Sequence, residues 1–378
     1  MQALYALRQA EFSNQQLALD GINELFQPDL NSMEPQNKRQ LEGYRKLAAL
    51  LFEEAIKTSQ PAQDEDAPKQ VLKAANDGFI FFQSRFKKDR QHLAQMMIKQ
   101  VNGIYDDYLR ILLLLIELGH AARIDRERQY RDPDETPFPF ESDLNDNTVI
   151  QALANLQPLR NEAVRHGISW TDDLPFVRKA LREVLKTDDT YRAYCAQQTH
   201  TADEDQALVQ YVLRTLIFKH EVIRDHLAEI DLSWTENSEV VRGLAIRTLK
   251  SAQGPTGLQL EPLTDDWEED EFFLNTLFNK SLDNHTDYEQ LLSEQLKNWD
   301  VERVALLDKI ILILAVCELL NFPNIPVKVT INEYIELAKA YSTPKSGKFV
   351  NGILDNLSEK LQASGRLRKS GRGLLDNK

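Results

Sequence analysis

The spacing of apolar residues constrains the fold of this 378-residue chain more than any other feature. Apolar positions recur every three or four residues along almost the whole sequence, and no run alternates as a strand does. Glycine and proline, at 14 residues each, are sparse. The pattern predicts an all-α protein. Helical stretches, with breaks inside the longer ones, are expected over residues 1–26, 36–60, 68–126, 147–198, 203–230, 236–251, 266–283, 286–298, 301–321, 328–342 and 346–363.

Three segments rich in proline, glycine or acidic residues interrupt this pattern, at residues 59–68, 132–147 and 254–266. Such segments are typical of loops and linkers. Helical regularity increases after the third, so a domain boundary is expected near residue 265. Residues 364–378 combine glycines with arginines and lysines, which predicts a flexible basic tail. This tail either contacts phosphates or is simply solvated.

The composition predicts a soluble, cytoplasmic protein. No apolar run approaches the roughly 20 residues of a membrane-spanning helix, and the amino terminus lacks the pattern of a secretory signal. The two cysteines, Cys195 and Cys317, have apolar neighbours and are expected in the core. The formal net charge of −14 repels nucleic acid, so RNA binding requires a local basic patch or a partner protein.

No motif in the sequence predicts catalysis. The glycine-rich loops of nucleotide-binding enzymes and the nucleophile elbow of serine hydrolases are absent. His220 and His226 share a helical stretch, but a spacing of six residues puts them on different helix faces, unlike a zinc-binding pair. The acidic run over residues 265–271 is typical of a solvated first helical turn. These features favour a binding or scaffolding protein without catalytic residues or a metal site.

The region after Asn298 carries three helical patterns. Asp300 is expected to cap the first helix, which ends before Pro323 and Pro326. The second begins near Val329 and stops at Thr343 and Pro344. Ser346 is then expected to cap the third helix, where backbone amides together with Lys345 and Lys348 form a compact site for a phosphate.

The strings IPVKV, INEYIELAK and KFVNGILD in this region are similar to the carboxy-terminal signature of the NusB family. Trp299, Arg303, Asp308 and Glu318 also match that signature, and the opening MQALYA resembles the first NusB helix. The arginine-rich stretch that usually precedes this helix is absent from the sequence, so either Met1 is an internal methionine or part of the family's RNA surface is lost here. The resemblance covers residues 1–10 and 270–361. It implies a first NusB-like helix followed by a long helical insertion within 1–265, subdivided near 59–68 and 132–147, and a NusB-like carboxy-terminal domain over 266–363.

The resemblance implies an RNA-associated transcription antitermination factor. NusB proteins consist of two helical bundles and bind boxA RNA together with NusE, a small-subunit ribosomal protein, in the transcription elongation complex. No cofactor is implied. The matching residues for RNA binding are Ser346, Lys348, Phe349, Gln2 and Tyr5, with Lys345 added from its charge. Asp308 and Glu333 match the acidic surface that the family presents to NusE.

Local reasoning leaves several of these assignments open. Phe349 either stacks on a base or fills the core, while Asn351 and Gly352 are expected to allow close helix packing rather than to touch ligand. Pro344 and Lys345 replace residues that are often acidic in the family, which alters the expected RNA preference.

Two other functions compete with antitermination. A NusB-fold scaffold without specific RNA binding is compatible with the acidic chain and the missing arginines. An RNA methyltransferase with a NusB-like domain is disfavoured, because that domain precedes the catalytic one in such enzymes and here the signature lies at the end.

Overall fold

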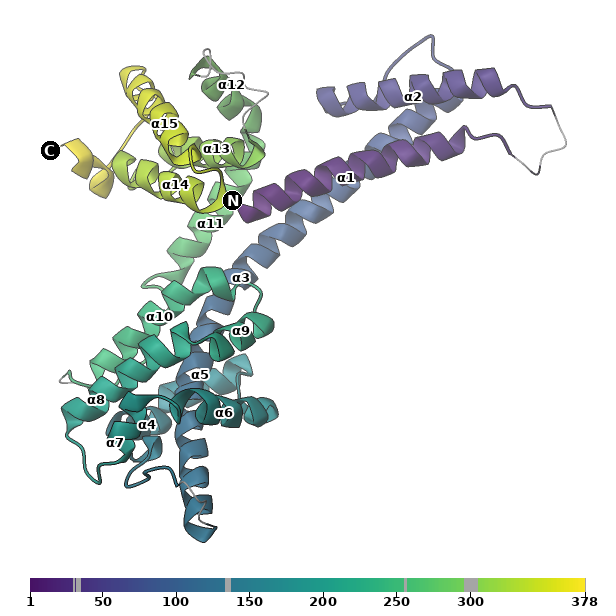
Figure 1. Ribbon diagram of the computed structural model, residues 1–378. Coiled ribbons are helices and arrows are strands. Elements are labelled where there is room, and N and C mark those ends of the chain that lie inside the picture. Colours follow the sequence, from purple (N-terminus) through teal and green to yellow (C-terminus); the bar gives the residue numbers. More distant parts are fainter. Residues whose placement is uncertain (30, 32–34, 133–136, 255–256, 296–304, 378) are drawn as a thin grey trace. The chain divides into compact units, whose positions relative to one another are not determined.

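The computed structural model describes residues 1–377 except 30, 32–34, 133–136, 255–256 and 296–304 (Figure 1). Every regular element in these described ranges is a helix, which confirms the predicted all-α class. The helices fall into two compact units, residues 1–98 with 268–378, and residues 99–267. No helix of the described part is long and apolar enough to cross a membrane.

The first unit joins the two ends of the chain. The predicted boundary near residue 265 lies next to the limit between the units, but residues 1–98 group with the carboxy-terminal helices. Its elements are α1 (Gln2–Leu25), α2 (Lys38–Thr58), residues 69–98 of α3 (Lys69–Arg131), α11 (Trp267–Asp283), α12 (His285–Gln295), α13 (Leu306–Asn321), α14 (Val327–Tyr341), α15 (Ser346–Ala363) and a final 3-10 segment (Gly371–Asn377).

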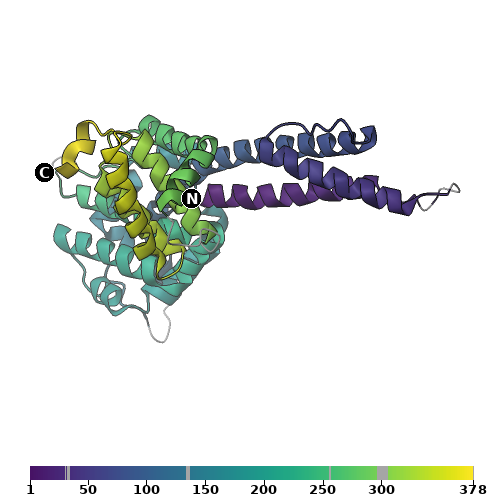
Figure 2. The ribbon, with the colours of Figure 1, turned by 90° about the horizontal axis from the view of Figure 1, so that it is seen from above.

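Two hydrophobic cores hold the first unit together. One core forms where α1, α2 and the start of α3 pack as three long helices, and it includes Ile22, Phe52 and Phe79 (Figure 2). The other joins Leu4 and Leu7 of α1 to the helices from α11 to α15. The burial of Leu4 and Leu7 in this core therefore anchors the start of α1 to the carboxy-terminal helices.

Helix α13 forms the centre of the second of these cores. Eleven of its 16 residues are buried, because its sequence is apolar almost all round rather than on one face. Cys317 lies on this helix and is buried, as predicted. The expected cap Asp300 and the signature residues Trp299 and Arg303 lie outside the described residues.

The second unit has a single hydrophobic core that extends from residues 104–122 of α3 to α10. Its helices after α3 are α4 (Thr148–Asn155), α5 (Gln157–His166), α6 (Leu174–Ala180), α7 (Asp189–Cys195), α8 (Ala202–Tyr211), α9 (Glu221–Ile230) and α10 (Trp234–Ser251), with two π-helical turns at Leu181–Leu185 and Val212–Ile217. Cys195 is buried in this core, as predicted.

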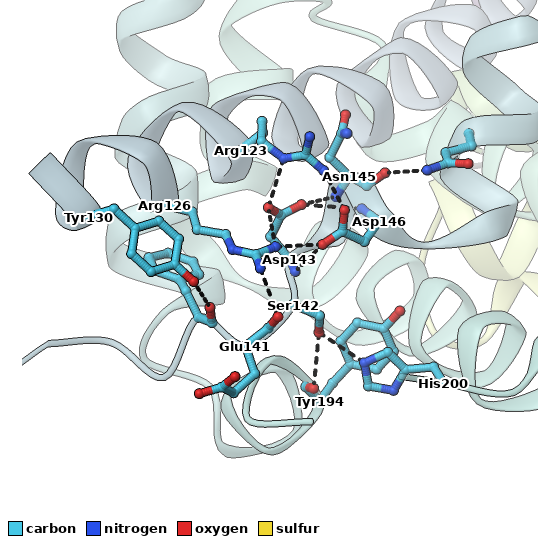
Figure 3. Close-up of polar contacts among 12 residues, drawn as sticks. Arg123, Arg126, Tyr130, Glu141, Ser142, Asp143, Asn145, Asp146, Tyr194 and His200 are labelled. Atoms are coloured by element: carbon cyan, nitrogen blue, oxygen red, sulfur yellow. Dashed lines mark hydrogen bonds and ion pairs between the residues drawn. The ribbon is translucent and has the colours of Figure 1, made fainter. Parts of the chain in front are cut away.

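Arginines from α3 fix the loop before α4 (Figure 3). The carboxylate of Asp143, which is fully buried, accepts hydrogen bonds from Arg123 Nε at 3.1 Å and Arg126 Nη1 at 3.3 Å. Both arginines also pair with Asp146. The positive charges of Arg123 and Arg126 are therefore neutralised by carboxylates of the same chain.

The loops expected at 59–68, 132–147 and 254–266 all separate helices in the structure. The helical stretch expected over 147–198 is divided into several shorter helices, in agreement with the breaks predicted for the longer stretches, and Pro158 and Pro175 each lie at the start of one of them. Proline is favoured in a first helical turn because its missing N–H would have no partner there.

The tail after α15, predicted to be flexible, makes contacts in the structure. Leu367 packs against the carboxy-terminal core, and Ser370 N donates to Pro323 O at 2.9 Å. Lys369 Nζ donates to Phe322 O at 3.1 Å. Part of its predicted positive charge therefore faces the protein.

Candidate nucleic-acid interface

The turn between α14 and α15 presents two lysines. Helix α14 ends at Tyr341, and Ser346 N donates to Thr343 O at 2.9 Å as the chain turns into α15. Lys345 immediately precedes α15 and Lys348 lies in its first turn, and both side chains are exposed. The positive end of the helix dipole and two ammonium groups therefore coincide at this place.

Ser346 lies beneath these lysines and is only 2% exposed. Its hydroxyl donates to Asp308 Oδ2 at 2.9 Å and lies 2.8 Å from Thr343 Oγ1 and 3.1 Å from Ser342 Oγ. It also accepts from Thr343 N at 3.3 Å. The predicted capping role of Ser346 is wrong: Lys345 occupies the cap position, with no side-chain cap, and Ser346 is the first helical residue.

Asp308 links α13 to this turn. It is 6% exposed, and its Oδ1 atom is buried with no hydrogen-bond partner among the described residues. The carboxylate was expected on a partner-binding surface, but burial leaves little of it for another protein to contact. Its visible contact is with Ser346, across 38 residues of sequence. Glu333, the other acid expected on that surface, is exposed on α14.

The remaining predicted RNA-binding residues lie on α15 and α1. Phe349 is half-buried and packs against the carboxy-terminal core, so its ring contributes to packing. Gln2 is exposed, and Tyr5 is 39% exposed. Leu4 and Leu7 attach α1 to the same core as α15. Residues from the two ends of the sequence are thus part of one packed unit.

Besides the Ser346–Asp308 hydrogen bond, a buried polar contact joins α13 and α14. Tyr334 Oη donates to Glu318 Oε2 at 2.9 Å, and both residues are buried. Burial raises the pKa of the Glu318 carboxyl, while hydrogen bonds from Thr330 and Tyr334 act in the opposite direction. This contact fixes the helix that carries Glu333.

Glycine has its packing role at a position that the sequence did not indicate. A Cβ atom at Gly347 would lie 2.9 Å from Lys339 Cγ, so α14 and α15 approach closely there. At Gly352 nothing lies within 4 Å of such an atom. The predicted packing role of Gly352 is therefore wrong. Only the packing of α14 against α15 distinguishes the two glycines, because both occur in the same helical sequence pattern.

The chain is similar in sequence to known proteins. A sequence model of the NusB family matches residues 240–359. The transcription antitermination protein NusB of Salinibacter ruber is 42% identical over 103 residues, which are 27% of this chain and 64% of that protein. Its namesake in Chloroherpeton thalassium is 43% identical over 104 residues, 28% of this chain and 49% of that protein.

A third relative is covered more fully. The transcription antitermination protein NusB of Bacillus mycoides is 38% identical over 102 residues, which are 27% of this chain and 78% of that protein. The chain therefore covers less than two thirds of the first two relatives and more than two thirds of the third. No solved structure matches the chain.

Proposed function

Because the chain belongs to the NusB family, we propose that it is a transcription antitermination factor that binds boxA-type RNA together with NusE in the transcription elongation complex. The observation that carries this proposal is the α14–α15 turn, where exposed Lys345 and Lys348 lie above the buried Ser346–Asp308 hydrogen bond. Such complexes assemble in the bacterial cytoplasm, where we place the protein.

In this proposal the two lysines contact phosphates, and the turn gives them their position. Lys345, Lys348 and the first amides of α15 supply positive charge at one end of a helix. Phe349 adds a half-buried ring beside them. Ser346 contributes by holding the turn against Asp308, because its hydroxyl is already fully engaged. Gln2 and Tyr5 extend the RNA contact from α1.

The acidic face of α14 is the proposed contact for NusE. Glu333 is exposed there, and a basic partner complements a chain with net charge −14. Asp308, which is buried, contributes instead by holding the α14–α15 turn through Ser346.

The proposal is tested by binding of boxA RNA and of a scrambled control RNA, each with and without NusE, at two salt concentrations. We expect preferential binding of boxA RNA that NusE strengthens and that Lys348→Ala/Phe349→Ala weakens. Lys219→Ala, which removes an exposed lysine from the second unit, is the control and leaves binding unchanged.

The acidity of the chain favours one alternative, a NusB-fold scaffold that binds NusE without specific RNA recognition. Binding of NusE without any preference for boxA RNA would support this alternative and exclude the RNA-binding role.

A further inference from the structure

We infer that an exposed face of α3 binds the phosphates of single-stranded RNA outside the α14–α15 turn. This surface, the α3 basic surface, consists of Phe81, Arg85 and Lys88 on one side of the helix, together with the exposed Lys87 on the adjacent side. It lies in the helical insertion, beyond the residues that resemble the NusB family. The inference rests on the proposed RNA-binding function and adds to it a second, sequence-independent contact.

Charge along α3 is locally opposite to that of the whole chain. Between Asp77 and Asp106 the sequence has five lysines and arginines and a single acid, Asp89, whereas the chain carries a net charge of −14. Residues 99–267 are strongly acidic, with 19 lysines and arginines against 29 aspartates and glutamates. A positive surface in such a chain is a favourable place for a polyanion to bind.

Contacts with neighbouring helices fix the orientation of α3 and engage Asp89, the single acid of this segment. Asp89 Oδ2 accepts a hydrogen bond from Asn14 Nδ2 at 2.6 Å. Arg90 is used in a separate contact, since its Nη1 atom lies 2.8 Å from Asp283 Oδ1 of α11. Phe86 and Leu93 pack against the carboxy-terminal core. The acid that would neutralise the neighbouring lysines is therefore turned inward.

The outer side of α3 keeps its positive charge. Arg85, Lys87 and Lys88 are exposed, and no carboxylate forms an ion pair with them within the described ranges. Arg85 Cζ lies 5.4 Å from the ring centroid of Phe81, which is 37% exposed. Phe81, Arg85 and Lys88 follow a spacing of four and three residues, so they share one side of the helix.

Cations beside an exposed aromatic ring suit single-stranded RNA better than an acidic protein. The cations follow the phosphate backbone, and a ring stacks on a base of any identity. The α3 basic surface supplies positive charge in the same unit as the proposed RNA-binding turn. Leu93 of α3 and Leu7 of α1 pack in one core, so both helices belong to the same framework.

The test measures binding of a short polyuridine, which lacks boxA, to the full chain over a series of salt concentrations. Each phosphate contact with single-stranded RNA adds about 0.7 to the slope of log K against log salt. We expect Arg85→Gln/Lys87→Gln/Lys88→Gln to lower the slope by about 2 and the affinity at 0.1 M salt by about 100-fold. Phe81→Leu should weaken binding by about fivefold or more without changing the slope.

Arg178→Gln/Lys179→Gln is the control, since it removes exposed charges from α6 in the second unit and should leave the slope unchanged. Circular dichroism verifies that each variant is folded. An unchanged slope in the α3 variant, with boxA preference intact, overturns this inference alone. Absence of any RNA binding by the wild-type chain overturns both this inference and the proposed function. Binding of an acidic protein, but not polyuridine, at the same residues also overturns it.

Discussion

The hydroxyl of Ser346 determines how the α14–α15 turn is held. We predict that Ser346→Ala lowers the free energy of unfolding of the first unit by about 1–3 kcal/mol, because the buried Asp308 carboxylate loses its donor. Urea unfolding measures this change. Affinity for boxA RNA should fall with it, since Lys345 and Lys348 are carried by the same turn.

Ser293→Ala is a matched control for Ser346→Ala. Ser293 is exposed, and among the described residues its hydroxyl donates to the nearby Gln290 O in its own helix. If both substitutions destabilise the protein equally, the Ser346–Asp308 contact does not hold the turn.

Single residues differ in how far the sequence predicts their position. Lys345 was added to the predicted RNA-binding residues from its charge alone, and its side chain is exposed. Ser346 was expected to cap a helix because serine is common there, whereas the structure buries it against Asp308. Local patterns cannot reveal such a role, since it depends on a residue that lies 38 positions away.

At the scale of elements, the packing of α14 against α15 distinguishes Gly347 from Gly352. We predict that Gly352→Ala raises the free energy of unfolding by about 0.5–1 kcal/mol, because alanine restricts the unfolded chain and meets no neighbouring atom within the helix packing. Thermal or urea unfolding measures the gain.

The same change at Gly347 should give less or reverse sign, since its new methyl group would displace the side chain of Lys339. An equal gain at both positions would show that α14 and α15 do not approach closely at Gly347.

The existence of most helices was predictable, because their sequences have the apolar period and the loops between them carry proline, glycine or acids. The contacts between the helices were less predictable from the sequence. The inward turn of Asp89 toward Asn14 depends on α1 and α3 packing together, and the helical period of α3 alone gives no sign of it. The α3 basic surface is therefore a result of packing as much as of sequence.

At the scale of the whole molecule, separate cores make the two units separable in stability. The core of residues 99–267 shares no residue with the two cores of the first unit. The resemblance to NusB assigned both ends of the chain to the same family fold. That all of residues 1–98 belong to one unit with the carboxy-terminal helices could be seen only from the packing of Leu4, Leu7 and Leu93 in the carboxy-terminal core. The site proposed for RNA lies entirely in this first unit.

We therefore predict that Leu213→Ala, at a fully buried position of the second unit, lowers the stability of that unit by about 2–5 kcal/mol through the cavity it leaves. Hydrogen exchange measured by mass spectrometry should show faster exchange in residues 104–249 and unchanged exchange in α13 and α15. Affinity for boxA RNA should also be unchanged under conditions in which the unit remains folded. Leu314→Ala in α13 is the reciprocal variant, because it is buried in the carboxy-terminal core and should accelerate exchange there instead. Loss of RNA binding in Leu213→Ala, with α15 still protected, would mean that the second unit takes part in recognition, contrary to a site confined to the first.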